Sequence, residues 1–169
     1  WIDWLGIGLC AAALLALLGL GGYGMASGFV QSKSYVDASG WVAVGTGGLG
    51  ICCALYLVLE LGGRLDQRQV IGIVLLSGMM SSLSVARGVP AALTLASGRP
   101  ASVDFVVTAY ESGGKGCRAG GLVAANAGYE ELHMCASGLG TRPPIGATLE
   151  LSGVGSDLGI LRQGVRVLR

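Results

Sequence analysis

The residues best suited to chemistry gather in one short stretch of the carboxy-terminal half. His133, the single histidine of the chain, falls two residues after Glu131 and two before Cys135. This alternate spacing puts all three on one face of a β-strand, with Cys117 expected on the neighbouring strand. Thiolates, imidazole and carboxylate are the usual ligands of zinc. A metal- or redox-active module using Cys117, Cys135 and His133 is therefore one alternative.

A disulfide explains the same residues more simply. Their spacing matches no strong zinc pattern, such as two C-x-x-C pairs. Cys117 bonded to Cys135, with His133 in solvent, needs no bound ion. We therefore expect no metal and no cofactor, and we interpret Cys10, Cys52 and Cys53 as small apolar residues.

The rest of the chain carries no catalytic motif. Segments 19–24 and 45–50 match G-x-G-x-x-G, but they lie in apolar runs without the preceding strand that a dinucleotide site requires. The sequences G-x-S-x-G and H-E-x-x-H are absent, and one histidine leaves little for acid–base catalysis. The chain is therefore expected not to be an enzyme.

The cysteines fall on two strands that we expect to pair. Side chains alternate with a period of two over residues 101–110, and residues 117–125 and 129–136 are the next candidate strands. A turn at 126–128, centred on Asn126, would bring Cys117 directly opposite Cys135. Facing side chains lie about 4.5–5.5 Å apart, which is close to disulfide geometry. The pattern predicts a cross-strand disulfide.

The remaining strands complete a small all-β domain. Residues 145–152 alternate as a fourth strand, 153–157 form a turn, and 158–168 are a last extended stretch broken at Gly164. Five short strands in residues 98–169 indicate a barrel or sandwich of OB-like or SH3-like type. Its core is small, so the disulfide would help to stabilise it.

Charge and hydropathy place the first part of the chain in a membrane. Residues 1–97 carry eight charged side chains, whereas the remaining residues carry thirteen. Mean hydropathy is +0.67 and 52% of residues are hydrophobic, which is typical of an integral membrane protein. Apolar runs predict transmembrane helices at about 4–30, 41–61 and 70–90, the first retained rather than cleaved as a signal peptide. The expected fold is a membrane α-helical bundle of three helices followed by a small all-β barrel- or sandwich-like domain.

The end of the third helix is open between two interpretations. Arg87, Gly88 and Pro90 follow an uncharged run that stops at Ala86, and proline disfavours helical geometry in the residue before it. The helix breaks or kinks there, or it continues to about Ala96 and buries Arg87. An arginine near a helix end usually extends its side chain to the lipid headgroups, and we favour that placement.

Small residues recur on one face of the second helix and on one face of the third. Such faces let helix backbones approach closely, and serines bond across helices. They predict a compact bundle or, alternatively, a face for a partner subunit or self-association. No span has the paired ionisable residues of an ion path, which argues against a solitary transporter. These positions are Ala43, Gly47, Gly50 and Ala54, then Ser77, Ser81, Ser84 and Gly88.

Few charges determine the orientation. Arg64 and Arg68 lie in the second connection and only Lys33 in the first, so the positive-inside rule places the amino terminus in the cytoplasm. The β domain then lies outside the cytoplasm, in agreement with a disulfide, which persists in oxidising compartments.

A basic edge at the end of the chain suggests how the β domain makes contact. Arg162, Arg166 and Arg169, together with Arg87 in the third helix, are candidates for contact with lipid headgroups or an acidic partner. A net charge of +1 predicts no attraction to nucleic acid. We expect an accessory or assembly subunit of a membrane complex, with other subunits or a second copy as partners. A membrane immunity protein that neutralises a toxin is a further alternative.

Overall fold

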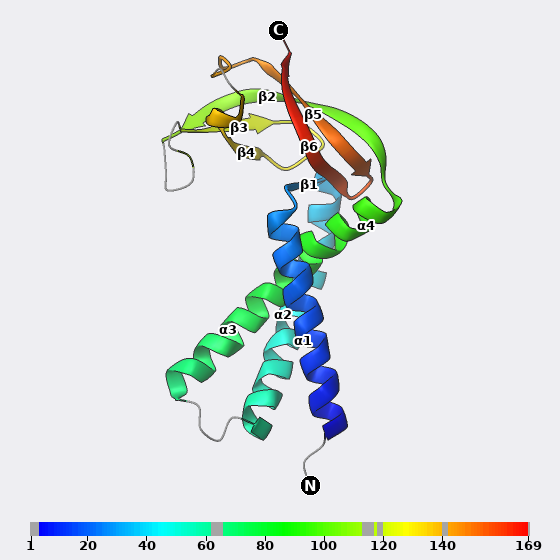
Figure 1. Cartoon of the computed structure of the whole chain (residues 1–169), viewed down its shortest axis with the longest axis vertical. Helices are drawn as coiled ribbons and strands as arrows, with labels where there is room; N and C mark the ends of the chain where they lie inside the picture. The colour runs from blue at the N-terminus through cyan, green and yellow to red at the C-terminus, as the bar shows by residue number, and fades with distance from the viewer. Residues whose placement is uncertain (1–3, 62–65, 113–116, 118–119, 140–141, 169) are drawn as a thin grey trace. The chain divides into compact units, whose positions relative to one another are not determined.

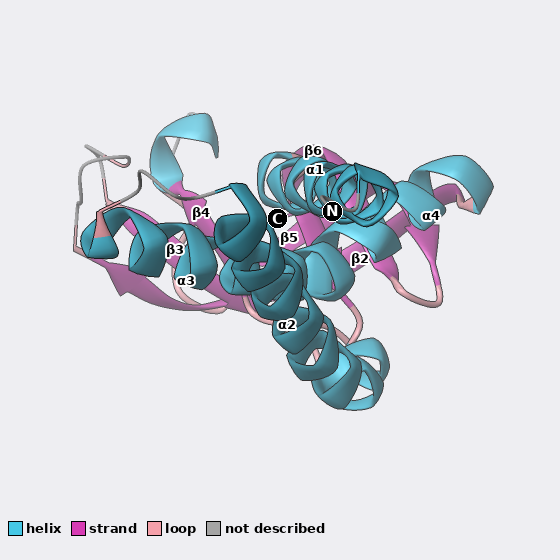
Figure 2. Cartoon of the chain, turned by 90° about the horizontal axis from the view of Figure 1, so that it is seen from below, coloured by secondary structure: helices cyan, strands magenta, loops and turns pink. Residues whose placement is uncertain are grey.

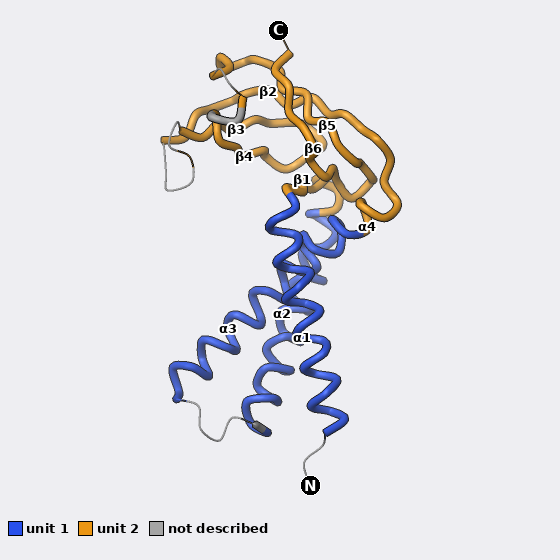
Figure 3. The backbone as a smooth tube through the Cα atoms, viewed as in Figure 1, with its two compact units in different colours: residues 1–27, 36–92 blue, residues 28–35, 93–169 orange. Residues whose placement is uncertain are grey.

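The computed structural model describes residues 4–61, 66–112, 117, 120–139 and 142–168 (Figure 1). Contacts divide the chain into two compact units, residues 1–27 with 36–92 and residues 28–35 with 93–169 (Figure 3). Residues 28–35, which connect the first two helices, and residues 93–97 fall in the second unit. Figure 2 distinguishes the helices from the strands by colour.

Three long apolar segments are helical. They are α1 (Trp4–Ala26), α2 (Lys33–Leu61), and a third made of α3 (Gln67–Leu83), a π-helical turn η1 (Ser84–Gly88) and α4 (Val89–Ser97). Each is long and apolar enough to cross a membrane. The chain therefore has the make-up of a multi-pass membrane protein, as its hydropathy predicts.

The first connection is shorter than expected, and it is ordered. α1 stops at Ala26, because Gly28 turns the chain with a φ of +65°, a conformation that favours glycine. α2 begins at Lys33 instead of Trp41, since the Ser32 hydroxyl accepts the Tyr35 N–H at 3.3 Å as an N-cap. Phe29 and Val30, predicted to end the first span, form strand β1 (Phe29–Gln31).

The third helix continues through Arg87 and Pro90 to Ser97. A proline has no N–H, and its ring collides with the carbonyl four residues earlier in a regular α-helix. The π-helical turn just before Pro90 widens the helix there, and the Val89 N–H bonds the Ser84 carbonyl. Arg87 lies in this turn and is partly buried.

The small-residue faces lie at helix contacts within the helical unit. The Ser82 hydroxyl donates to the Ala43 carbonyl at 3.0 Å, and Ala54 is 1% exposed. A Cβ on Gly50 would lie 2.7 Å from the Ser81 Cβ and 2.9 Å from the Ser77 carbonyl oxygen. Backbones therefore approach closely between α2 and α3.

The part of the third helix's small-residue face that lies in η1 meets α1. The Ser84 hydroxyl donates to the Leu17 carbonyl and also lies 2.8 Å from the Met80 carbonyl oxygen. A Cβ on Gly24 would lie 2.6 Å from the Gly88 nitrogen, so the two glycines permit close contact between the helices.

The β unit is a single six-stranded antiparallel sheet, with one strand more than predicted. Its order is β1-β6-β5-β2-β3-β4, and a short 3-10 helix, η2 (Ala136–Leu139), follows β4. The other strands are β2 (Arg99–Glu111), β3 (Gly121–Ala125), β4 (Leu132–Cys135), β5 (Thr148–Ser156) and β6 (Gly159–Leu168).

β1 closes most of this sheet into a barrel. On one side its residues pair with Leu161, Ile160 and Gly159 of β6. On the other side the Gln31 carbonyl accepts the Glu130 N–H at 3.0 Å, and Ser32 forms a bridge with Tyr129. The two edges of the sheet therefore meet through one short strand, which gives a nearly closed barrel.

The core of the barrel follows the predicted alternation, with one correction. Its fully buried side chains include Phe105, Leu122, Leu149, Leu151 and Ile160. A register shift between Val107 and Ala109 interrupts the period of two predicted over 101–110, so that Ala109 turns outward and Tyr110 packs on the core.

Two breaks predicted in the last strands are wrong. β5 continues through 153–156, and β6 is unbroken at Gly164. Gly153 is needed for close packing, because a Cβ there would lie 3.2 Å from the Gln163 nitrogen. Gly153, which suggested a turn, instead lets β5 and β6 pack closely at a register shift between Ser152 and Gly153.

Candidate functional site: a pocket between β4 and β6

The expected disulfide joins Cys117 and Cys135, with Cα atoms 5.2 Å apart. The predicted hairpin register is wrong, because Gly121 and not Cys117 faces Cys135. The β3–β4 connection is longer than a tight turn at Asn126 would make it. Cys117 precedes β3, and its carbonyl accepts the Gly120 N–H at 3.0 Å. Gly120 has a φ of +85°, a conformation that favours glycine.

His133 pairs with carboxylates at the surface of the barrel. Its Nδ1 lies 3.0 Å from Glu111 Oε1, and its Nε2 lies 3.9 Å from Glu131 Oε2. All three side chains are more than half exposed, so these contacts contribute little to stability. Sequence reasoning missed Glu111, which the sheet register places across β3 from Cys135, because Glu111 pairs with Gly121 and Gly121 pairs with Cys135.

The proposed zinc ligands are arranged differently from a metal site. The two sulfurs are bonded to each other, and thiolates are therefore not available in this state. Within the part of the chain that the structure describes, no three His, Cys, Asp or Glu side chains are grouped to hold a metal ion.

Beside β6 the barrel wall is incomplete. β1 pairs with Gly159–Leu161 only, whereas β6 continues to Leu168. Among the described residues, no strand pairs with 162–168 on the side away from β5. Every second residue of an edge strand directs its N–H and C=O away from the sheet, and these groups can take another strand.

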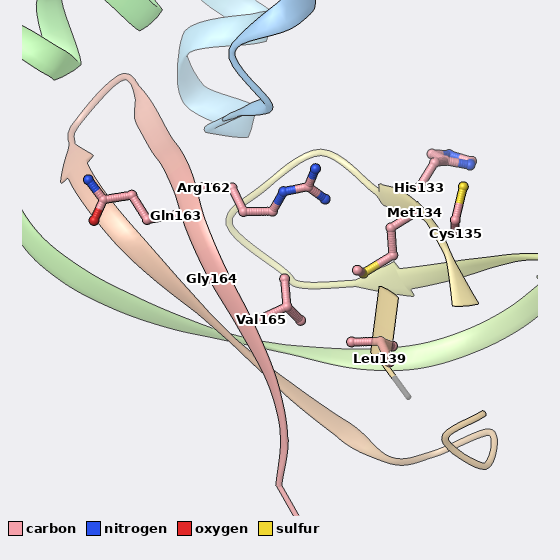
Figure 4. A pocket seen from close by; sticks show the side chains of 8 residues that line it. All are labelled: His133, Met134, Cys135, Leu139, Arg162, Gln163, Gly164 and Val165. Carbon is pink, nitrogen blue, oxygen red and sulfur yellow. The ribbon is translucent and has the colours of Figure 1, made fainter. Parts of the chain in front are cut away.

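A pocket of about 520 Å³ occupies this position, and we call it the β4–β6 pocket (Figure 4). Its floor is apolar, because Met134, Leu139 and Val165 pack against the barrel core. Its rim is polar, and Figure 4 shows the Arg162 side chain extending from β6 toward β4. The lining residues are His133, Met134, Cys135, Leu139, Arg162, Gln163, Gly164 and Val165.

Arg162 is the one cation of this lining with a permanent charge. A Cβ on Gly28 would lie 3.5 Å from its Nε, so the guanidinium lies against the start of β1. It makes no hydrogen bond or ion pair with any residue in the described ranges. Arg166, by contrast, bonds Glu150 at 3.2 Å. Of the two described arginines of the basic edge, Arg162 is therefore the one whose guanidinium is available for a ligand. Arg169 lies outside the described residues.

Comparison of the chain with protein-family models, curated proteins and solved structures finds no match. Function must therefore be inferred from the residues themselves. An apolar floor, one unpaired guanidinium and a strand edge can hold an extended, anionic group. The sequence named Arg162, His133 and Cys135 as candidates, but not the floor, because it depends on which strands meet.

Proposed function

We propose that the chain is a non-enzymatic membrane protein that acts by binding another protein through its β domain, as an accessory or assembly subunit of a membrane complex. The β4–β6 pocket is the observation that carries the proposal. It combines partly buried apolar residues, a strand edge and an unpaired cation. Such a combination marks a binding surface more often than isolated apolar residues do.

The proposed orientation has the amino terminus in the cytoplasm and the β domain outside it. Arg64 in the second connection and Arg68 at the start of α3 outweigh Lys33 at the start of α2, which supports this assignment. The Cys117–Cys135 disulfide supports it independently, because disulfides are rare in the cytosol.

The sheet supports a crossing of three spans. With three spans, the connection after α1 and the segment after α4 emerge on the same side of the membrane. β1 comes from that connection and pairs with β6 of the carboxy-terminal segment. If only one of the two helices between β1 and β6 crossed, these paired strands would be separated by a bilayer.

Co-purification tests the proposed function. The tagged full-length chain, extracted from its own membranes in mild detergent, should bring down a protein in fixed stoichiometry. An unrelated tagged three-span protein prepared in parallel identifies background. A clean monomer or a homo-oligomer alone would contradict an accessory role.

A toxin-neutralising protein would use the same kind of pocket, and deletion separates the two functions. Loss of the chain should weaken assembly or activity of the complex that co-purifies. Lethality that disappears when a neighbouring toxin gene is also deleted would assign the chain to immunity instead.

A further inference from the structure

We propose that the β4–β6 pocket receives the extended carboxy-terminal tail of a partner protein, which adds to β6 as a strand and places its terminal carboxylate on Arg162. This inference rests on the proposed function and names the chemistry of the partner segment. Addition of a strand to a sheet edge is a recurrent way of binding peptides.

The pocket continues the position of β1 in the barrel. Where β1 is present, a single strand bonds β6 on one side and the segment leading into β4 on the other. β1 begins only at Phe29, because the residues before it belong to α1 and to the turn at Gly28. β6, in contrast, runs on past Arg162 without a neighbouring strand on that side among the described residues. The pocket lies there, lined from both β6 and β4. A second strand can therefore follow the same path and pair with β6.

The sheet determines which end of the tail approaches Arg162. Every strand pair in it is antiparallel, and a strand antiparallel to β6 runs from beside Leu168 toward beside Arg162. Its carboxyl end then points at Gly28 and β1, which block further extension along β6. A chain that ends there fits this position without a turn.

Charge complements this geometry. The incoming carboxylate would meet the guanidinium of Arg162, which has no other partner among the described residues. Arginine binds carboxylate through two parallel hydrogen bonds, and such bonds are stronger than neutral ones. The Arg162 side chain already lies against Gly28, at the end where the tail would stop.

The pocket floor gives the tail its side-chain preference. Alternate residues of an added strand point toward the barrel interior. There they would cover Met134, Leu139 and Val165, which are only partly buried in the free protein. The tail should therefore alternate apolar residues with polar ones.

Two peptide pools test the carboxylate directly. Both contain pentapeptides with alternating random apolar and polar residues; one pool ends in free acids and the other in amides. They are passed over immobilised full-length protein in detergent. Free acids should be retained at least about tenfold more than amides, since a hydrogen bond to a charged group contributes this much.

Matched variants show whether Arg162 reads the carboxylate. Arg162→Gln should abolish the preference for free acids. Comparing both proteins with both peptide termini is a double-mutant cycle, and it isolates the interaction between Arg162 and the carboxylate. Arg166→Gln removes a cation that is paired with Glu150, and it should leave the preference unchanged. Both variants alter exposed side chains, so folding is preserved and circular dichroism checks it.

Hydrogen exchange distinguishes strand addition from binding of the carboxylate alone. Retained peptides should slow amide exchange within 163–168, and backbone N-methylation of the peptide should remove both the retention and this protection.

Equal retention of acids and amides, or no retention, would overturn the inference. So would protection of 163–168 without peptide in a dimer of this chain, or binding of anionic lipid vesicles through Arg162 that excludes the peptides. A partner that co-purifies equally well with wild type and Arg162→Gln would leave the accessory role standing while this mode of binding fails.

Discussion

Two serines on one helix face differ in what their hydroxyls contact. Ser84 donates to the Leu17 carbonyl across the helix interface, whereas the buried Ser81 hydroxyl has no hydrogen-bond partner in the described chain. Ser84→Ala should therefore destabilise the helical unit by about 0.6 kcal/mol, and by no more than about 1.7 kcal/mol. Ser81→Ala should be neutral or stabilising, because it removes an unsatisfied polar group. Unfolding in mixed detergent micelles measures both, and equal losses would contradict the assigned contacts.

Two glycines of α1 provide a second matched pair. A Cβ on Gly24 would lie 2.6 Å from the Gly88 nitrogen and 2.7 Å from the Arg87 carbonyl carbon, whereas one on Gly22 meets nothing within 4 Å. Backbone atoms cannot move aside cheaply, so Gly24→Ala should cost about 1–3 kcal/mol. Gly22→Ala should gain up to about 1 kcal/mol from helix propensity. The same unfolding assay compares them, and tolerance of Gly24→Ala would argue against this helix contact.

At the residue scale the sequence predicted side-chain types better than partners. The spacing of Glu131, His133 and Cys135 indicated a shared strand face, but Glu111 comes from a strand two positions away in the sheet. Its contact with His133 depends on a diagonal approach across β3, since Glu111 pairs with Gly121 and His133 with Val123, and on a register that the loop after β3 determines. Neither is visible in local alternation.

At the scale of the elements, the disulfide links the segment before β3 to the end of β4. It joins cysteines eighteen positions apart, and closing such a loop restricts the unfolded chain by about 3 kcal/mol. Reduction should therefore lower the melting temperature of the β unit by about 10–20 °C. Circular dichroism at sheet wavelengths measures it. The double variant Cys117→Ala and Cys135→Ala should melt at the reduced temperature and be insensitive to reductant; a response in that variant would implicate other thiols.

Helices and strands could be predicted where a single hydrophobic pattern extends over the whole element. They could not be predicted where a helix and a strand share one apolar run. Strands of period two indicated the β domain, and uncharged runs indicated the helices. β1 was hidden because Phe29 and Val30 continue the apolar run of α1, and only the positive φ of Gly28 separates them. The π-helical turn was also hidden, since Pro90 is usually a sign that a helix ends.

At the scale of the whole molecule, one short strand links the membrane part to the β domain. The connection between the first two apolar helices completes part of the barrel, and the part that it leaves incomplete contains the β4–β6 pocket. Three spans and a β domain were predictable from composition and periodicity. The pocket was not, because it exists only where β4 and β6, distant in sequence, face each other across a missing strand.

The central claim is that the β domain presents this pocket outside the cytoplasm, where a partner occupies it. Labelling with a membrane-impermeant maleimide in intact cells tests it most directly, using Val165→Cys in the pocket and Ser102→Cys on exposed β2, with Cys10, Cys52 and Cys53 replaced by alanine. We predict that Ser102→Cys reacts in intact cells, and that Val165→Cys reacts several-fold more slowly there than in the purified, partner-free protein. Labelling of both positions only after the cells are opened would contradict the account.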